Sequence, residues 1–140
     1  MFKYLRVQLM HPCRAQCAWC STHKKNSIFQ SLQDEGRAEN FHQTYLEVIE
    51  RYRPSELFIS GGEPLLDPNI ESFVQQADQW VDRIHIFTSY QFARSVMERV
   101  ANASFPASVV LNHTPIYFEP DRWHKLTAGF PFDVYIDNIK

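Results

Sequence analysis

Residues 4–20 read Tyr-Leu-Arg-Val-Gln-Leu-Met-His-Pro-Cys-Arg-Ala-Gln-Cys-Ala-Trp-Cys, a largely apolar run followed at once by a cluster of cysteines. The apolar part, residues 4–10, is typical of a β-strand, and Pro12 ends it because proline has no backbone N–H for the strand ladder. The cluster holds all three cysteines of the chain, Cys13, Cys17 and Cys20. We therefore expect the cysteines on a loop at the carboxyl end of the first strand.

Outward from this stretch, strand-like and helix-like segments alternate along the chain. A polar stretch at residues 21–39 is expected to form a long loop. Further strands are predicted at residues 56–60, 84–88, 109–112 and 134–136, and helices at residues 41–52, 68–81, 90–100 and 120–126. Asp67 and Ser89 are expected to cap the second and third of these helices. Such alternation predicts an α/β protein with a parallel sheet.

The number of segments indicates a partial barrel. A complete eight-stranded barrel takes about 250 residues, so a single domain of 140 residues corresponds to an open, partial (β/α) TIM-type barrel of about five parallel strands with outer helices. Ligands of such sheets bind beyond the carboxyl ends of the strands. The segments expected to meet there are the cysteine loop, residues 61–64, Thr88 with Ser89, Asn112 with His113, and Asp137.

Composition argues against two classes of partner. The chain has 14 basic and 16 acidic residues and a formal net charge of -2, so it shows no electrostatic footprint for nucleic acid or an anionic membrane surface. No stretch approaches the roughly 18 consecutive apolar residues of a membrane span, and the first residues lack the features of a signal peptide. A cytoplasmic location is the expectation that follows.

The cysteine cluster is best explained by a metal centre. Three cysteines cannot all pair with one another, and their clustering without a signal peptide favours a metal or redox site over a disulfide framework. A structural zinc site normally has four protein ligands, whereas an iron–sulfur cluster held by three cysteines keeps one iron open to another ligand. Two alternatives remain at this point: a zinc site completed by His11 or His23, and cysteines that bind no metal.

A second motif, Ser-Gly-Gly-Glu-Pro at residues 60–64, follows directly on the second predicted strand. The Cys-x3-Cys-x2-Cys spacing after one strand, with this turn after the next, resembles the radical S-adenosylmethionine superfamily. The order of the two motifs, their strand context and their separation all agree with that family. The resemblance covers roughly residues 4–112 and weakens after them.

The resemblance implies two cofactors. Cys13, Cys17 and Cys20 would bind a [4Fe-4S] cluster, and the amino and carboxylate groups of S-adenosylmethionine would chelate the fourth iron. An electron donor such as flavodoxin or ferredoxin would reduce the cluster. One electron then cleaves the sulfonium, and the resulting 5′-deoxyadenosyl radical abstracts hydrogen from a substrate, here an unknown organic or peptidyl one.

The resemblance also implies cofactor-binding residues. They are Gly61, Gly62, Glu63 and Pro64 for the methionine amino group, Trp19 near the adenine, and Ser89 and Asn112 for the ribose and carboxylate. Each has a simpler alternative. The turn can be a plain strand-to-helix connection, Trp19 a shield of the cluster from water, Ser89 a helix cap and Asn112 a turn residue.

The chain departs from the family at its carboxyl-terminal end. Family members have about six strand–helix units, and this chain ends just after its fifth predicted strand. We therefore expect a missing carboxyl-terminal segment, a partner chain or a second copy to cover the edge at residues 134–136, since an exposed edge strand invites pairing. The same departure motivates an alternative function, a non-catalytic iron–sulfur protein that carries electrons or serves as a binding subunit.

Overall fold

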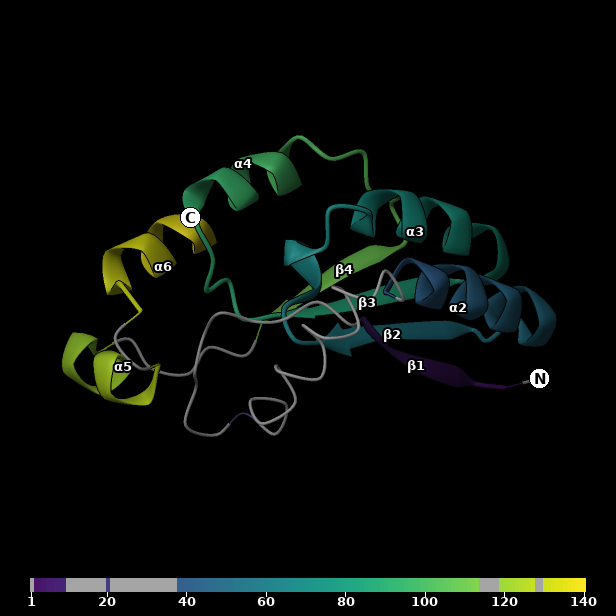
Figure 1. Ribbon diagram of the computed structural model, residues 1–140, viewed down its shortest axis with the longest axis horizontal. Helices are drawn as coiled ribbons and strands as arrows, with labels where there is room; N and C mark the ends of the chain where they lie inside the picture. The colour runs from purple at the N-terminus through teal and green to yellow at the C-terminus, as the bar shows by residue number, and fades with distance from the viewer. Residues whose placement is uncertain (1, 10–19, 21–37, 114–118, 128–129) are drawn as a thin grey trace.

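The computed structural model describes residues 2–9, 20, 38–113, 119–127 and 130–140, and these form a four-stranded parallel sheet with helices (Figure 1). The strands are β1 (Tyr4–Leu9), β2 (Glu56–Gly61), β3 (Arg83–Thr88) and β4 (Val109–His113), in the order β1-β2-β3-β4. The helices are α2 (Ala38–Tyr52), α3 (Ile70–Ala77), α4 (Arg94–Ala101), α5 (Pro120–Leu126) and α6 (Phe132–Ile139). Two short 3-10 helices, η2 (Pro64–Leu66) and η3 (Asp78–Trp80), flank α3.

Helices α2, α3 and α4 all lie on one face of the sheet (Figure 1). Alternate strand residues point into this layer, and they form the core with the apolar stripes of the helices. Its fully buried members include Leu57, Ile59, Ile84, Ile86 and Phe73. The opposite face has no such cover over much of its area, since Tyr4 is 65% and Val110 is 40% exposed there.

The predicted α/β class, the parallel open sheet and its compatibility with a partial barrel are confirmed, but the fifth strand is wrong. Residues 134–136 lie inside helix α6, which Pro131 precedes and in which Asp133 occupies the favourable first turn. A short apolar run fits either structure, and the buried pair Tyr135 and Asn138, three residues apart, follows helical spacing. The expected edge strand is therefore absent from these residues, and Asp137 lies on an exposed helix surface near Arg94 rather than at a strand end.

Two helix starts also differ from the predictions. Helix α3 begins at Ile70 after Asn69, and the Asp67 side chain instead accepts a hydrogen bond from the Asn69 N–H at 2.8 Å. Helix α4 begins at Arg94, so Ser89 is not its cap. The loop predicted at residues 21–39 falls mostly outside the described residues, and its last two positions belong to α2.

No helix in the described part of the chain combines the length and the apolar character that a membrane crossing requires.

Candidate functional site at the carboxyl ends of the strands

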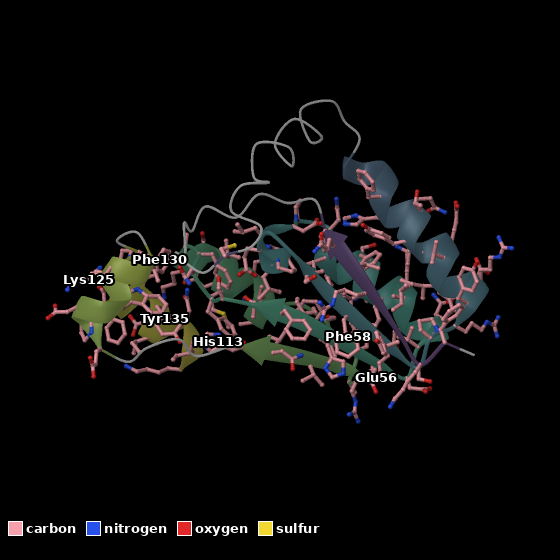
Figure 2. All side chains as sticks on the ribbon, turned by 90° about the horizontal axis from the view of Figure 1, so that it is seen from below. Glu56, Phe58, His113, Lys125, Phe130 and Tyr135 are labelled. Atoms are coloured by element: carbon pink, nitrogen blue, oxygen red, sulfur yellow. The ribbon has the colours of Figure 1, made fainter. Side chains whose placement is uncertain are left out.

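The site is the group of segments that follow β2, β3 and β4 at one edge of the sheet. We call it the mouth and define it as residues 61–64, 88–90 and 112–113. Because the strands are parallel, their carboxyl ends lie at this common edge. Helices α5 and α6 lie beyond the same edge in both views (Figures 1 and 2).

Gly61 links the mouth to the first strand. It pairs with Leu9 in the sheet and has φ +139°, a conformation that side chains rarely adopt. A Cβ atom at Gly61 would lie 2.3 Å from the carbonyl oxygen of Leu9. Only glycine therefore permits this close approach, which positions the end of β1 and so the start of the cysteine-bearing segment.

Glu63 joins the segments after β2 and β3. Its side chain is buried, with 1% of the residue exposed. One carboxylate oxygen accepts from the Leu65 N–H at 3.2 Å, and the other accepts from the Ser89 N–H at 2.9 Å and the Ser89 hydroxyl at 2.8 Å. Burial raises the pKa of the Glu63 carboxyl, and the hydrogen bonds from Ser89, Thr88 and Leu65 oppose that rise.

Side chains from two helices, α4 and α2, contact the segment that follows Glu63. Arg99 of α4 donates to the carbonyl oxygen of Leu65 and, at 3.2 Å, to that of Asp67. His42 of α2 places its Nε2 2.8 Å from a carboxylate oxygen of Asp67. Because α2 follows the cysteine-bearing segment, both ends of that segment are connected to residues 61–67. The His42 side chain is largely buried by these contacts, with 18% of it exposed.

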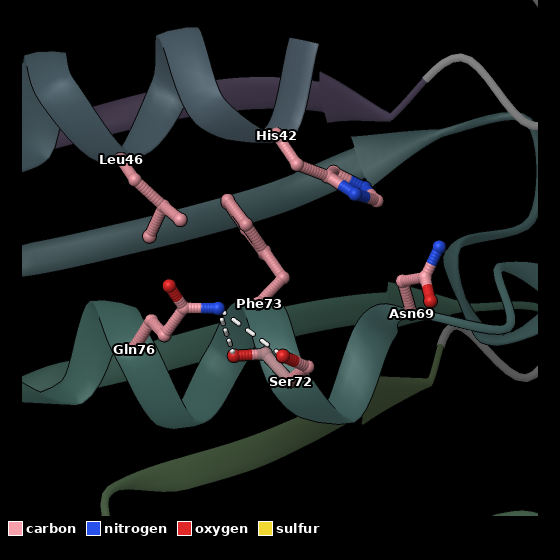
Figure 3. Close-up of a pocket in the computed structure, with 6 residues that line it drawn as sticks. All are labelled: His42, Leu46, Asn69, Ser72, Phe73 and Gln76. Carbon is pink, nitrogen blue, oxygen red and sulfur yellow. Dashed lines mark hydrogen bonds between the residues drawn. The ribbon is translucent and has the colours of Figure 1, made fainter. Parts of the chain in front are cut away.

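A pocket of about 370 Å³ lies beside this His42–Asp67 pair, between α2 and α3 (Figure 3). It is lined by His42, Leu46, Asn69, Ser72, Phe73 and Gln76. The His42 ring stacks on Phe73 with 5.1 Å between ring centroids, and the Gln76 amide donates to Ser72. The pocket belongs to the helical layer and not to the mouth.

Tyr90, which the sequence analysis did not select, is a mouth residue with an unusual backbone. Its φ is +56°, in the left-handed region that favours glycine. The Tyr90 N–H donates to the Thr88 hydroxyl at 3.1 Å, and the buried amide of Asn138 donates to the Tyr90 carbonyl at 3.0 Å and to that of Phe92 at 2.9 Å. No sequence signal marks a tyrosine for this conformation.

At the end of β4, His113 forms a partly buried contact with helix α6. Its Nδ1 lies 3.4 Å from the Thr88 carbonyl oxygen, which can only accept, so Nδ1 carries the hydrogen. Nε2 then accepts from the Tyr135 hydroxyl at 2.6 Å. Burial lowers the pKa of His113, and its hydrogen bond to Thr88 partly opposes this. Figure 2 shows His113 and Tyr135 side by side near α6.

Asn112 differs from the other predicted mouth residues. Its amide nitrogen lies 3.2 Å from His85 Nδ1 and 3.2 Å from the Val110 carbonyl oxygen. His85 stacks on Phe58 with 4.7 Å between centroids, and its Nε2 lies 3.2 Å from a Glu56 carboxylate oxygen. Asn112 therefore takes part in a polar and aromatic row on the less covered sheet face.

The predicted site residues thus fall into three groups. The structure brings together Gly61, Gly62, Glu63, Pro64 and Ser89, and it places Asn112 on the neighbouring strand. Cys13, Cys17 and Trp19 lie outside the described residues, and Cys20 is partly buried. Within the described part of the chain, no three histidine, cysteine or acidic side chains form a possible metal centre. A [4Fe-4S] cluster nevertheless fits the donor set of three thiolates, and the close approach of Gly61 to Leu9 fixes where their segment begins.

A comparison with known protein families matches residues 5–111, which is most of the chain, to the family described as "4Fe-4S single cluster domain". No curated protein matches. The match favours an iron–sulfur cluster over the zinc alternative, and it ends before helices α5 and α6.

Proposed function

The chain belongs to the family of 4Fe-4S single cluster domains, and we propose that it is a radical S-adenosylmethionine enzyme, or the catalytic part of one, with an organic or peptidyl substrate. The observation that carries the proposal is the pairing of Gly61 with Leu9. Through it, the Gly-Gly-Glu-Pro turn lies directly beside the strand end from which the cysteine segment starts. A cluster and a molecule bound at the turn would therefore be neighbours.

The residues that would hold the cluster are Cys13, Cys17 and Cys20. When bound and reduced, the cluster supplies the electron that cleaves S-adenosylmethionine. Gly61 and Gly62 keep side chains away from the turn, so that its backbone can approach the cofactor closely. Glu63 places a negative charge at the turn and fixes the segment after β3 through Ser89.

The test is anaerobic reconstitution with iron and sulfide, followed by dithionite reduction in the presence of S-adenosylmethionine. We expect the brown absorbance of a [4Fe-4S] cluster and the formation of 5′-deoxyadenosine. Cys17→Ala should lose both, whereas Ser95→Ala, at an exposed position of α4, should keep both. An intact cluster that never yields 5′-deoxyadenosine would instead support the non-catalytic electron carrier.

The proposed activity implies two partners. One is a one-electron donor of the flavodoxin or ferredoxin type. The other is a partner chain or second copy at β4, one of the two edge strands of the described sheet, since the strand predicted at residues 134–136 is part of a helix. Sedimentation of the reconstituted protein tests the second: a monodisperse monomer that binds S-adenosylmethionine fully by itself would exclude it.

A further inference from the structure

Helix α2 lies directly after the part of the chain that carries the cysteines. The chain leaves the sheet at Leu9, the last residue of β1, and α2 begins at Ala38. All three cysteines lie between these two positions. Helix α2 contacts both β1 and α3. It is therefore placed to connect the two ends of the cysteine-bearing segment, residues 10–37.

Tyr45 connects α2 to the end of β1. Its hydroxyl donates to the carbonyl oxygen of Gln8 at 3.0 Å, and Gln8 directly precedes Leu9. The Tyr45 side chain also packs against the hydrophobic core. Burial raises the pKa of the Tyr45 phenol, and its hydrogen bond to Gln8 partly opposes this. The phenol therefore stays protonated at neutral pH and can donate to the strand.

His42 lies three positions before Tyr45, on the same side of α2, and connects the helix to the segment after the Gly-Gly-Glu-Pro turn. Its Nε2 lies 2.8 Å from a carboxylate oxygen of Asp67, and because a carboxylate only accepts, Nε2 carries the hydrogen. Asp67 is 6% exposed and is itself held by the Asn69 N–H and by Arg99. His42 is in turn fixed by its stacking on Phe73 (Figure 3).

These two contacts act on the same segment from one helix face. Tyr45 holds the strand end from which the segment starts, and His42 holds the first turns of the helix that follows it. A loop whose ends are already fixed loses less conformational entropy when its side chains converge on one ligand. The contacts therefore favour convergence of the three cysteines on a single metal centre.

We propose that Tyr45 and His42 are positioning residues for the iron–sulfur cluster, which hold both ends of residues 10–37 and so slow the loss of iron. Neither residue belongs to the two sequence motifs. The inference rests on the proposed ligands Cys13, Cys17 and Cys20, but not on the proposed cleavage of S-adenosylmethionine.

The experiment measures iron release from the anaerobically reconstituted protein into an excess of a ferrous-iron chelator, with urea unfolding of the same proteins. Tyr45→Phe removes only the hydroxyl, and His42→Phe removes the nitrogen donor while keeping a ring against Phe73. Thr127→Val is the matched control, because it also removes one hydroxyl that donates to a carbonyl oxygen, that of Trp123 in α5, at 2.8 Å.

We expect Tyr45→Phe and His42→Phe each to release iron about twofold to tenfold faster than the wild type, the ratio that corresponds to the loss of one hydrogen bond. The double variant should release it faster than either single variant. Thr127→Val should release iron at the wild-type rate, even though urea unfolding shows a loss of stability. The electron paramagnetic resonance spectrum of the reduced cluster should broaden in the two α2 variants and stay unchanged in the control.

Wild-type rates of iron release in both α2 variants would overturn the inference. So would release rates that rise in all three variants in proportion to their loss of stability, because the α2 contacts would then act only on the fold. A wild type that binds no iron would overturn the ligand assignment together with the inference. A wild type that keeps its cluster but never forms 5′-deoxyadenosine contradicts the proposed enzyme alone and leaves the comparison of the variants intact.

Discussion

Ser89 holds the carboxylate of Glu63 with two hydrogen bonds, from its backbone N–H at 2.9 Å and from its hydroxyl at 2.8 Å. The resemblance assigned both residues to a cofactor, Glu63 for an ammonium group and Ser89 for the ribose or the carboxylate. In the structure they also bind each other, and so connect the segments after β2 and β3. This contact fixes the Gly-Gly-Glu-Pro turn against the segment after β3.

The first prediction concerns this contact. Ser89→Ala removes the hydroxyl that donates to the Glu63 carboxylate. Glu63→Gln replaces one accepting oxygen by an amide NH2 group, which then faces a hydrogen-bond donor, Leu65 or Ser89. Each variant should lower the free energy of unfolding by about 1–3 kcal/mol, because a buried charged acceptor loses a partner or a donor is left unsatisfied. The double variant should lose less free energy of unfolding than the two single variants lose together. Urea unfolding in a double-mutant cycle measures this difference. Strict additivity would mean that the two residues do not act as a pair.

The second prediction concerns Gly61. Gly61→Ala should destabilise the fold by more than about 1 kcal/mol, because φ is +139° and the new Cβ would meet the Leu9 carbonyl oxygen at 2.3 Å. Gly62→Ala is the matched control, since Gly62 is not among the positive-φ glycines of the described residues. Because Leu9 precedes the cysteines, Gly61→Ala should also reduce the iron bound after reconstitution. Equal stability of the two variants in urea would contradict this account.

The third prediction concerns helix α6. Asn138→Leu should destabilise the protein by about 1–3 kcal/mol, because the carbonyl groups of Tyr90 and Phe92 lose a buried donor. Asn102→Ala removes an exposed amide that donates to the Glu98 carbonyl, so a smaller loss is expected. Limited proteolysis should cut the Asn138 variant first near residues 89–93. Unchanged protection of that segment would show that α6 does not hold it.

The sequence predicted the four strands of the described sheet well because each is a run of five or six residues with a clear apolar pattern. The strand predicted at residues 84–88 is β3 almost to the residue, and the sequence after it marks the mouth. The run at residues 134–136 is only three residues long, and so local pattern could not decide between strand and helix. The α6 contacts that decide it come from residues 46 and 48 positions away in the chain.

The candidate site was predictable only where residue type limits the chemistry. Cysteine spacing and paired glycines are such features, and Gly61 and Glu63 do lie where parallel strands end. Tyr90 was missed because tyrosine carries no local preference for a positive φ, which here comes from Thr88 and Asn138. The His113–Tyr135 contact was missed because the segment containing Tyr135 was assigned to a strand.

The last prediction uses the pH dependence that His113 gives to stability. Its pKa is lowered in the folded protein, so the unfolded chain binds more protons as the pH falls below the ordinary histidine value of 6.5. The stability that the neutral His113 contributes is therefore present above that pH and is lost as the pH falls through the ordinary histidine range. Between about pH 8 and pH 5, the wild type should lose more of its free energy of unfolding than His113→Asn does. Parallel urea titrations of the two proteins measure this difference. Identical pH profiles would contradict a partly buried, neutral His113. Tyr135→Phe should lower stability most at the higher pH, because only the unprotonated Nε2 can accept the hydrogen bond that is lost.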